Sequence, residues 1–263
     1  MCFEFDAVPP ELPADMLRSP IAGGAPAEQL ELTSADGARF SAAFAEAPEP
    51  LPGPAVVIFP DVRGLYRFYS ELAERFAQAG RHAIAIDYFG RTAGLAPRDD
   101  EFDYGPHIAQ TTPEQIQADT AAAIAAMRDR VGDVPVVIVG FCFGGRQTIL
   151  ATANEQLGLA GAIPFYGGLS RGRPGMPSPL DQLETLRGPL LALYGGDDAS
   201  IPPEDRDELD RGLTATGADH EFVVYPGAPH SFFDRSQEQY ADASADAWRR
   251  VLGFLEAVPA PVA

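Results

Sequence analysis

VVIVGFCFGG, at residues 136–145, is the stretch that decides the fold. Its first four residues form an apolar run, which is typical of a strand buried on both faces of a parallel sheet. The residues from Gly144 to Asn154 have the spacing of a helix. Between them stands Gly-x-Cys-x-Gly, the pattern of a turn so tight that small residues must flank its centre. The stretch therefore predicts a strand, a sharp turn that lifts Cys142 above the sheet edge, and a helix.

Strands and helices alternate on both sides of this stretch. A hairpin is expected at 29–33 and 39–44, followed by strands at 55–59, 83–86, 136–139, 161–165, 190–194 and 221–225. The expected helices span 65–79, 113–130, 144–154, 202–216 and 236–257, with 90–111 as a loop or small cap segment. This alternation predicts an α/β fold with a mostly parallel, doubly wound sheet and helices on both faces. We expect one domain at 28–263, preceded by an extended arm at 1–27.

The composition excludes several classes of function. The chain of 263 residues has a formal net charge of −19, which argues against nucleic-acid binding and against docking on anionic lipid. No lysine is present, so a Schiff-base lysine and a Walker-type phosphate loop are excluded. The first residues lack the basic and apolar regions of a signal peptide, and no apolar stretch is long enough to cross a bilayer. We expect a cytoplasmic protein.

Cys142 is the candidate nucleophile. The N-terminus of the following helix favours a negative charge there and so promotes the thiolate. The backbone N–H of Phe143 would donate one hydrogen bond to an oxyanion, and that of Val62, in the loop after the first buried strand, a second. The alternative is a structural cysteine buried in a glycine-rich turn. Cys2, in the arm, shares none of this context and is expected to be incidental.

An acid and a histidine follow in the order that such a fold requires. Asp198 comes just after the strand at 190–194, and His230 lies in a Gly- and Pro-containing loop after the last strand. We predict that His230 reaches back to Cys142 while Asp198 holds its other nitrogen. Asp197 is a rival for the acid, and either aspartate could instead cap the helix that follows.

The remaining histidines have other predicted places. His82 is expected to be a structural or surface residue, His107 at most to line the pocket, and His220 to be solvated. Two cysteines are too few for a disulfide framework or a zinc ribbon, and no His-x-x-x-His pair is present. We expect no metal.

These motifs together resemble the dienelactone hydrolase family, which has the α/β-hydrolase fold. The similar segments are GFCFGG at 140–145, GGDDASIP at 195–202, APHSF at 228–232 and FPDVRGL at 59–65, and the likeness spans about residues 50–257. Cysteine at the elbow is the specific feature, since most α/β-hydrolases carry serine there. The resemblance implies hydrolysis of an enol-lactone through an acyl-cysteine intermediate, without a cofactor.

The resemblance also implies further site residues. Asp61 stands where the family has a thiol-activating glutamate, one methylene longer. Arg91 matches a position that holds the substrate carboxylate, and Arg235 is displaced by one residue from a second such position. Tyr166 matches a tyrosine of the family's pocket. The alternative for Arg91 is an ordinary salt bridge, and for Tyr166 a place in the core.

The leading hypothesis is a cysteine hydrolase of small ester or lactone substrates, including carboxylate-bearing ones. A second is a general carboxylesterase or thioesterase with an acyl pocket of Phe141, Phe143 and Tyr166. A third is a non-catalytic binding protein on a hydrolase scaffold, and a redox role for Cys142 is a further alternative. We expect a monomer or a small homo-oligomer.

Overall fold

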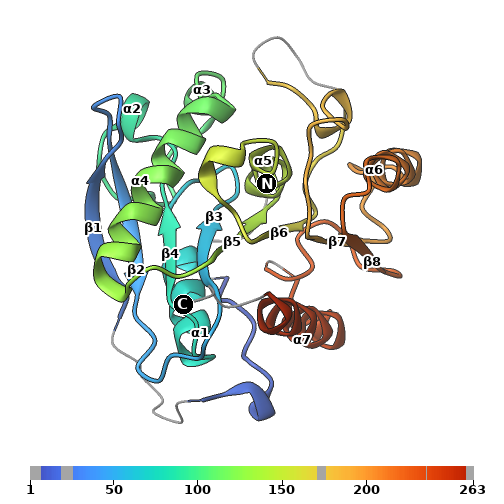
Figure 1. Ribbon diagram of the computed structural model, residues 1–263, viewed down its shortest axis with the longest axis horizontal. Coiled ribbons are helices and arrows are strands. Elements are labelled where there is room, and N and C mark those ends of the chain that lie inside the picture. Colours follow the sequence, from blue (N-terminus) through green and yellow to red (C-terminus); the bar gives the residue numbers. More distant parts are fainter. Residues whose placement is uncertain (1–6, 19–25, 171–175, 235, 259–263) are drawn as a thin grey trace.

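The computed structural model describes residues 7–18, 26–170, 176–234 and 236–258 of the chain. Within these residues, eight strands form one sheet in the order β1-β2-β4-β3-β5-β6-β7-β8 (Figure 1). The strands are β1 (Glu28–Thr33), β2 (Arg39–Ala45), β3 (Ala55–Phe59), β4 (Ala83–Ile86), β5 (Val136–Phe141), β6 (Gly161–Phe165), β7 (Leu190–Gly195) and β8 (His220–Tyr225). β2 pairs antiparallel with β1 and β4, and β4 to β8 run parallel with β3. The predicted mostly parallel sheet is confirmed.

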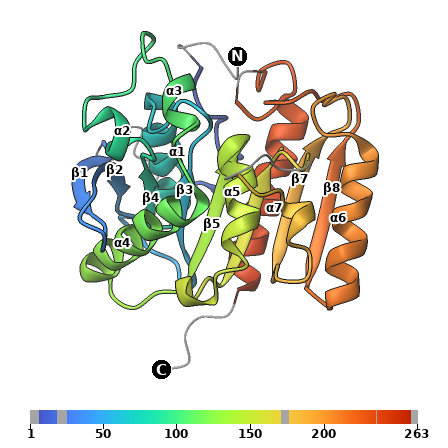
Figure 2. The same ribbon diagram turned by 90° about the horizontal axis from the view of Figure 1, so that it is seen from above.

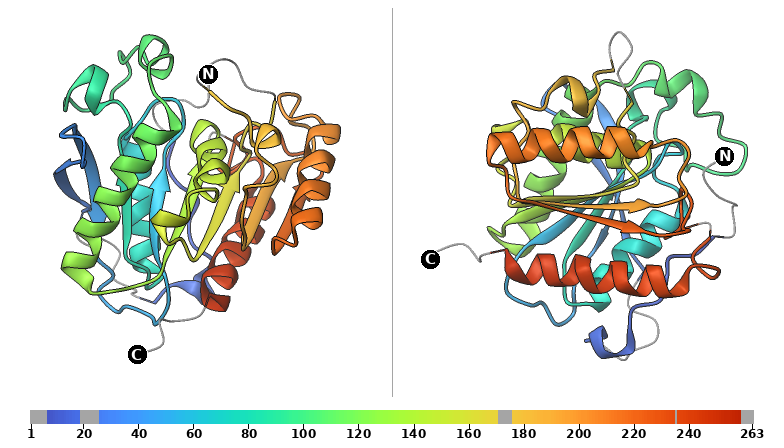
Figure 3. Two further views of the ribbon diagram at one scale, coloured as in Figure 1. Left: turned by 45° about the horizontal axis from the view of Figure 1, so that its top comes forward. Right: turned by 90° about the vertical axis from the view of Figure 1, so that its right-hand side faces the viewer.

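Helices cover both faces of this sheet. They are α1 (Arg67–Gln78), α2 (Gly90–Ala93), α3 (Gly105–Ile108), α4 (Pro113–Val131), α5 (Phe143–Ala151), α6 (Pro203–Thr216) and α7 (Ala241–Ala257), with short 3-10 turns η1 (Ala14–Met16), η2 (Glu155–Leu157) and η3 (Pro179–Asp181). α1 and α7 lie on one face, while α4, α5 and α6 lie on the other (Figures 1 and 3). The predicted α/β fold, doubly wound, is therefore the observed one.

The central strands are buried on both sides, which explains their unbroken apolar runs. In β3, Val56 and Ile58 pack into the cluster that includes residues of α1 and α7. Val57 and Phe59 pack into the second cluster, with residues of α4. Successive side chains of a strand point to opposite faces, so a strand between two helix layers needs an apolar residue at every position.

Trp248 of α7 joins the N-terminal arm to the body. Its ring packs edge to face on Phe76 of α1, with 5.1 Å between the centroids, and its Nε1–H donates to the Pro10 carbonyl at 3.1 Å. Leu12 is also buried. The described part of the arm thus lies against α1 and α7, whereas residues 1–6 and 19–25, including Cys2, lie outside the described residues. The division into arm and single domain stays a prediction.

The last helix begins later than its sequence pattern predicts. α7 starts at Ala241 rather than at 236, and turns occupy 236–240. The N–H groups of Ser236 and Gln237 donate to the carbonyls of Ser231 and Asp234, both at 3.3 Å. Because these hydrogen bonds close the loop that carries His230, the chain cannot also begin a helix there.

The parallel strands end at one edge of the sheet, where the loops with the candidate residues meet. β3, β5, β6 and β7 end at Phe59, Phe141, Phe165 and Gly195. α2 and α3 lie toward the same edge (Figures 2 and 3). In parallel α/β sheets this carboxyl edge is where ligands bind. Within the described part of the chain, no helix is both long and apolar enough to cross a membrane.

Candidate active site

Cys142 sits alone between the end of β5 and the start of α5, with backbone angles φ 54° and ψ −111°. A positive φ is unfavourable for a residue with a Cβ and is found where the surroundings hold it in place. The Cys142 N–H donates to the Phe165 carbonyl at 3.1 Å, which ties the turn to the end of β6. The side chain is half-buried. The predicted elbow is therefore present.

The glycines of the elbow are required by close backbone packing. A Cβ on Gly140 would lie 2.1 Å from Thr148 Oγ1, and one on Gly144 would lie 2.2 Å from the Pro60 carbonyl oxygen. The first turn of α5 therefore rests directly against the chain that leaves β3. Phe143 opens α5, where N–H groups have no carbonyl partner within the helix. The two predicted oxyanion donors, the N–H groups of Val62 and Phe143, therefore belong to two segments that pack against each other: the loop after β3 and the first turn of α5.

Replacing Gly144 by alanine is expected to destabilise the protein by at least about 3 kcal/mol, because two backbone oxygens would have to move. The melting temperature should fall by roughly 6 °C or more. The matched control is Gly253→Ala in α7, where a Cβ meets nothing within 4 Å and helix propensity improves. Thermal unfolding of both variants checks this, and equal melting temperatures would contradict the packing constraint.

His230 and Asp198 form a hydrogen-bonded pair. The distance from His230 Nδ1 to Asp198 Oδ2 is 2.6 Å. Asp198 is buried, while Asp197 is exposed and its backbone N–H donates to the Ala228 carbonyl. Ser200 fixes the other carboxylate oxygen, since its N–H and its hydroxyl both donate to Asp198 Oδ1, at 2.9 and 2.5 Å. Of the two rival aspartates, the structure brings Asp198 to the histidine.

Burial by itself would raise the pKa of Asp198, but hydrogen bonds from His230 and Ser200 hold it below its ordinary value of 3.8. A carboxyl whose pKa is lower in the folded chain than in the unfolded chain stabilises the fold at a pH above its unfolded-state pKa. This contribution is lost as the pH falls through the folded-state pKa.

Asp198→Asn should therefore be less stable than the parent protein by about 1–3 kcal/mol at pH 7, and equally so down to about pH 4. The difference should shrink below that pH. Chemical unfolding of the two proteins between pH 3 and pH 7 measures it, and a gap that persists at the lowest pH would show that the ionised pair is not its source.

Asp61 is completely buried beside the elbow. Its burial raises its pKa, against the opposing effect of the nearby Arg63 guanidinium and of His230. Asp61 Oδ1 accepts from the Arg63 N–H at 2.9 Å, and Arg63 Nε lies 3.5 Å from Oδ2. The structure thus places Asp61 at the site in an ion pair with Arg63, a partner that sequence reasoning did not foresee.

The loop between β8 and α7 that carries His230, here called the histidine loop, packs on the strand that leads to the elbow. The Phe233 ring stacks on Phe141 at 5.9 Å and lies 4.7 Å from Phe165. Tyr166, next to the carbonyl that binds the Cys142 N–H, has its ring centroid 4.9 Å from that of His230. Cys142 and His230 therefore both lie against the Phe165–Tyr166 segment, although 88 residues separate them in the sequence.

Two predicted substrate-binding side chains have other partners in the structure. Arg91, in α2, donates to Asp119 of α4 at 2.5 Å and to Asp36 of the β1–β2 turn at 2.9 Å. Tyr166 is fully buried, and its hydroxyl donates to Asp234. These placements favour the salt bridge for Arg91 and the core for Tyr166, the two alternatives left open above. Arg235 lies outside the described residues.

The other histidines have structural surroundings. His82 Nδ1 accepts from the Ala47 N–H at 3.1 Å, and His107 stacks on Phe102 with centroids 5.2 Å apart. His220 Nε2 lies 3.1 Å from Asp210. No group of three or more His, Cys, Asp or Glu side chains in the described ranges is arranged to hold a metal ion.

Sequence reasoning missed Ser200, Asp87 and Asp234. Ser200 had a signal, because an aspartate two residues before a serine is the spacing of a local turn closed by the carboxylate. Asp87 accepts hydrogen bonds from the Leu65 N–H at 3.1 Å and from the Arg98 guanidinium, and so secures the loop that carries Val62. Asp234 had no local signal.

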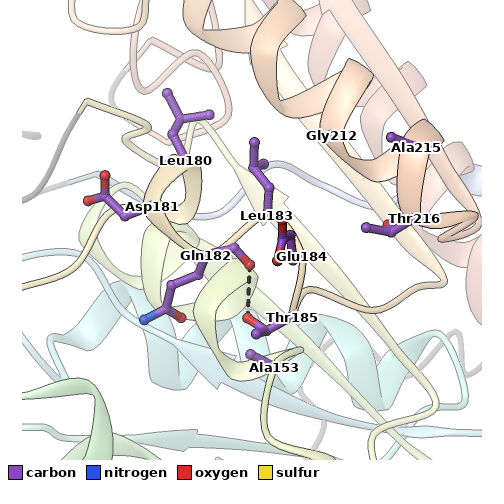
Figure 4. Close-up of a pocket in the computed structure, with 10 residues that line it drawn as sticks. All are labelled: Ala153, Leu180, Asp181, Gln182, Leu183, Glu184, Thr185, Gly212, Ala215 and Thr216. Atoms are coloured by element: carbon purple, nitrogen blue, oxygen red, sulfur yellow. Dashed lines mark hydrogen bonds between the residues drawn. The ribbon is translucent and has the colours of Figure 1, made fainter.

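A cavity of about 760 Å³ has none of the candidate site residues in its lining (Figure 4). It lies between the η3 segment and α6, and the residues that line it are Ala153, Leu180, Asp181, Gln182, Leu183, Glu184, Thr185, Gly212, Ala215 and Thr216. Ala153 follows the C-terminal end of α5, about 14 Å along the helix from the end that carries Cys142. Volume alone therefore does not locate the chemistry in this molecule.

The model of the dienelactone hydrolase family matches residues 40–258. The chain is 33% identical over 214 residues to a protein of Escherichia coli K12 named "Putative carboxymethylenebutenolidase", covering 78% of this chain and 77% of that one. A protein of Saccharolobus solfataricus with the same name is 30% identical over 262 residues, covering 85% and 96%. A crystal structure described as a "Putative Dienelactone Hydrolase", from Klebsiella pneumoniae, superposes with a TM-score of 0.74 at 28% identity, covering 88% of this chain and 99% of that one. The chain is a hydrolase of the α/β-hydrolase superfamily and belongs to the dienelactone hydrolase family.

Proposed function

We propose that the protein hydrolyses small ester or lactone substrates with Cys142 as nucleophile, His230 as base and Asp198 as the residue that orients the base. The observation that carries this proposal is the 2.6 Å bond from His230 Nδ1 to the buried Asp198. It leaves Nε2 as the nitrogen available to the thiol. The strained, half-buried elbow supports Cys142 as the nucleophile, with its thiol on the side of that nitrogen.

In the first half-reaction His230 accepts the thiol proton and the Cys142 sulfur attacks the carbonyl carbon. The oxyanion that forms accepts hydrogen bonds from the N–H groups of Val62 and Phe143. Collapse expels the alcohol, or opens the lactone ring, and leaves an acyl group on the sulfur. His230 returns its proton to the leaving oxygen.

In the second half-reaction His230 takes a proton from water, and the resulting hydroxide attacks the acyl-cysteine carbonyl. The same two N–H groups stabilise the second oxyanion, and collapse releases the acid and the thiol. Asp198 stabilises the histidine cation in both halves without accepting its proton. Asp61 is the candidate for activating the resting thiol, since it is fully buried and, within the described residues, its Oδ2 accepts no hydrogen bond, although Arg63 Nε lies 3.5 Å away.

The substrate class that family membership favours is an enol-lactone. A general carboxylesterase is the second candidate, and a specific observation supports it. The guanidinium of Arg91 is bound to Asp36 and Asp119 and the Tyr166 hydroxyl to Asp234, so these two groups are already engaged when no substrate carboxylate is bound. A role of Arg91 in holding a carboxylate stays a prediction, as does the oligomeric state.

Hydrolysis of cis- and trans-dienelactone, followed by ultraviolet absorbance, tests the proposal beside p-nitrophenyl acetate. Turnover of a lactone with kcat/KM well above that of the simple ester would support the enol-lactone class. Turnover of the ester alone would favour the carboxylesterase. If neither compound reacts while the fold is intact, the proposed substrate chemistry is wrong.

A further inference from the structure

We infer that Asp234 and Tyr166 act together as a positioning pair for His230, an inference that rests on the proposed function of this histidine. Asp234 is 1% exposed and lies in the histidine loop itself, four residues after His230. Its Oδ2 accepts a hydrogen bond from the Tyr166 hydroxyl at 2.8 Å. The bond joins the loop that carries His230 to the end of β6.

Tyr166 is a rigid reference point for the loop. Its side chain is fully buried, and its N–H donates to the Leu193 carbonyl of β7 at 2.8 Å. Its φ of 37° lies in the region that non-glycine residues rarely adopt, so its surroundings hold it firmly. Its ring then meets the His230 ring at 4.9 Å between centroids and an angle of 56°.

One hydrogen bond does not fix an imidazole ring. The bond from Nδ1 to Asp198 sets one point of the ring and still allows it to tilt about that point. The Tyr166 ring adds a contact on the ring of His230, and Asp234 fixes both the hydroxyl of that tyrosine and the loop that carries the histidine. A displacement of about 1 Å at a reacting group costs roughly 100-fold in rate, so control of this tilt matters for turnover.

The protonation of the pair suits this role. Burial raises the pKa of Tyr166 well above its ordinary value, and the neighbouring Asp234 carboxylate raises it further. The hydroxyl therefore keeps its proton and remains a donor. A buried carboxylate requires such donors, because an ionised group without them carries a large desolvation cost.

The test compares Tyr166→Phe, Asp234→Ala and the double variant, each with His230 present and with His230→Ala. The probes are p-nitrophenyl acetate, for kcat and KM, and iodoacetamide, whose reaction rate with Cys142 can be measured without the histidine. Tyr225→Phe is the matched control: its hydroxyl donates to Asp246 at 3.0 Å, the same kind of bond at the other end of the same loop, and its ring packs on Phe232.

We expect Tyr166→Phe and Asp234→Ala each to lower kcat about tenfold with little change in KM, and the double variant to be no worse than either single one. Tyr225→Phe should leave kcat unchanged. With His230→Ala, the Tyr166 change should no longer affect the iodoacetamide rate. An unchanged kcat in Tyr166→Phe, additive effects, or an effect that persists without His230 would overturn the inference. If His230→Ala itself leaves turnover unchanged, the proposed function fails as well, so the two failures are distinguishable.

Discussion

Cys142→Ala is expected to lower kcat for any substrate that the protein turns over by at least about 10⁴-fold, because no other group in the proposed mechanism can form the acyl intermediate. The fold should be unaffected, since alanine adds no atom to the elbow. Intact-protein mass spectrometry after mixing with p-nitrophenyl acetate should show an added acetyl group on the parent protein and none on the variant.

The matched comparison for Cys142 is Cys142→Ser, which keeps a hydroxyl nucleophile at the same strained position. An alanine variant that retains more than about 1% of the parent's kcat would show that the thiol is not the nucleophile. Circular dichroism of both variants separates loss of chemistry from loss of structure.

His230→Ala should lower kcat by about 10³-fold or more, since both proton transfers in the proposed mechanism pass through this side chain. The rate at which Cys142 reacts with iodoacetamide at pH 7 should fall too, because the thiol loses its proton acceptor and the thiolate loses the positive charge beside it.

His220→Ala is the control for the histidine. His220 also pairs with an aspartate, Asp210, at 3.1 Å, and it lies at the start of β8, the strand that leads to the histidine loop. Its removal should leave both rates unchanged. Equal effects of the two substitutions would contradict the role given to His230.

The parts of the site that the sequence could predict are those governed by local rules. The elbow follows from backbone sterics, because only glycine fits beside the Pro60 carbonyl and the Thr148 hydroxyl. Asp198 and His230 follow from the ends of strands, which fix the edge where their loops meet. The fold class follows from apolar runs that fit only a sheet covered on both faces.

The parts that could not be predicted depend on contacts between distant segments. The resemblance gave Arg91 as a substrate ligand, and its ion pairs, which join α2 to a turn 55 residues earlier and to α4 28 residues later, had no signal in the sequence. The Tyr166–Asp234 bond spans 68 residues. Neither residue stands in a local pattern that indicates its partner, since an arginine or a tyrosine can make such bonds with any neighbour that the fold supplies. The late start of α7 has a different origin, in the local hydrogen bonds that close the histidine loop.

Trp248 gives the molecule a built-in optical probe. It is the only tryptophan of the chain, it is fully buried, and it touches α1 through Phe76, the histidine loop through Phe233 and the arm through Pro10. Water that reaches the indole shifts its fluorescence emission to longer wavelength. Detachment of the arm or opening of the histidine loop would therefore be visible in the emission spectrum while the helix and sheet signals of circular dichroism stayed constant. Stopped-flow fluorescence can then test, without an added label, whether either change accompanies turnover.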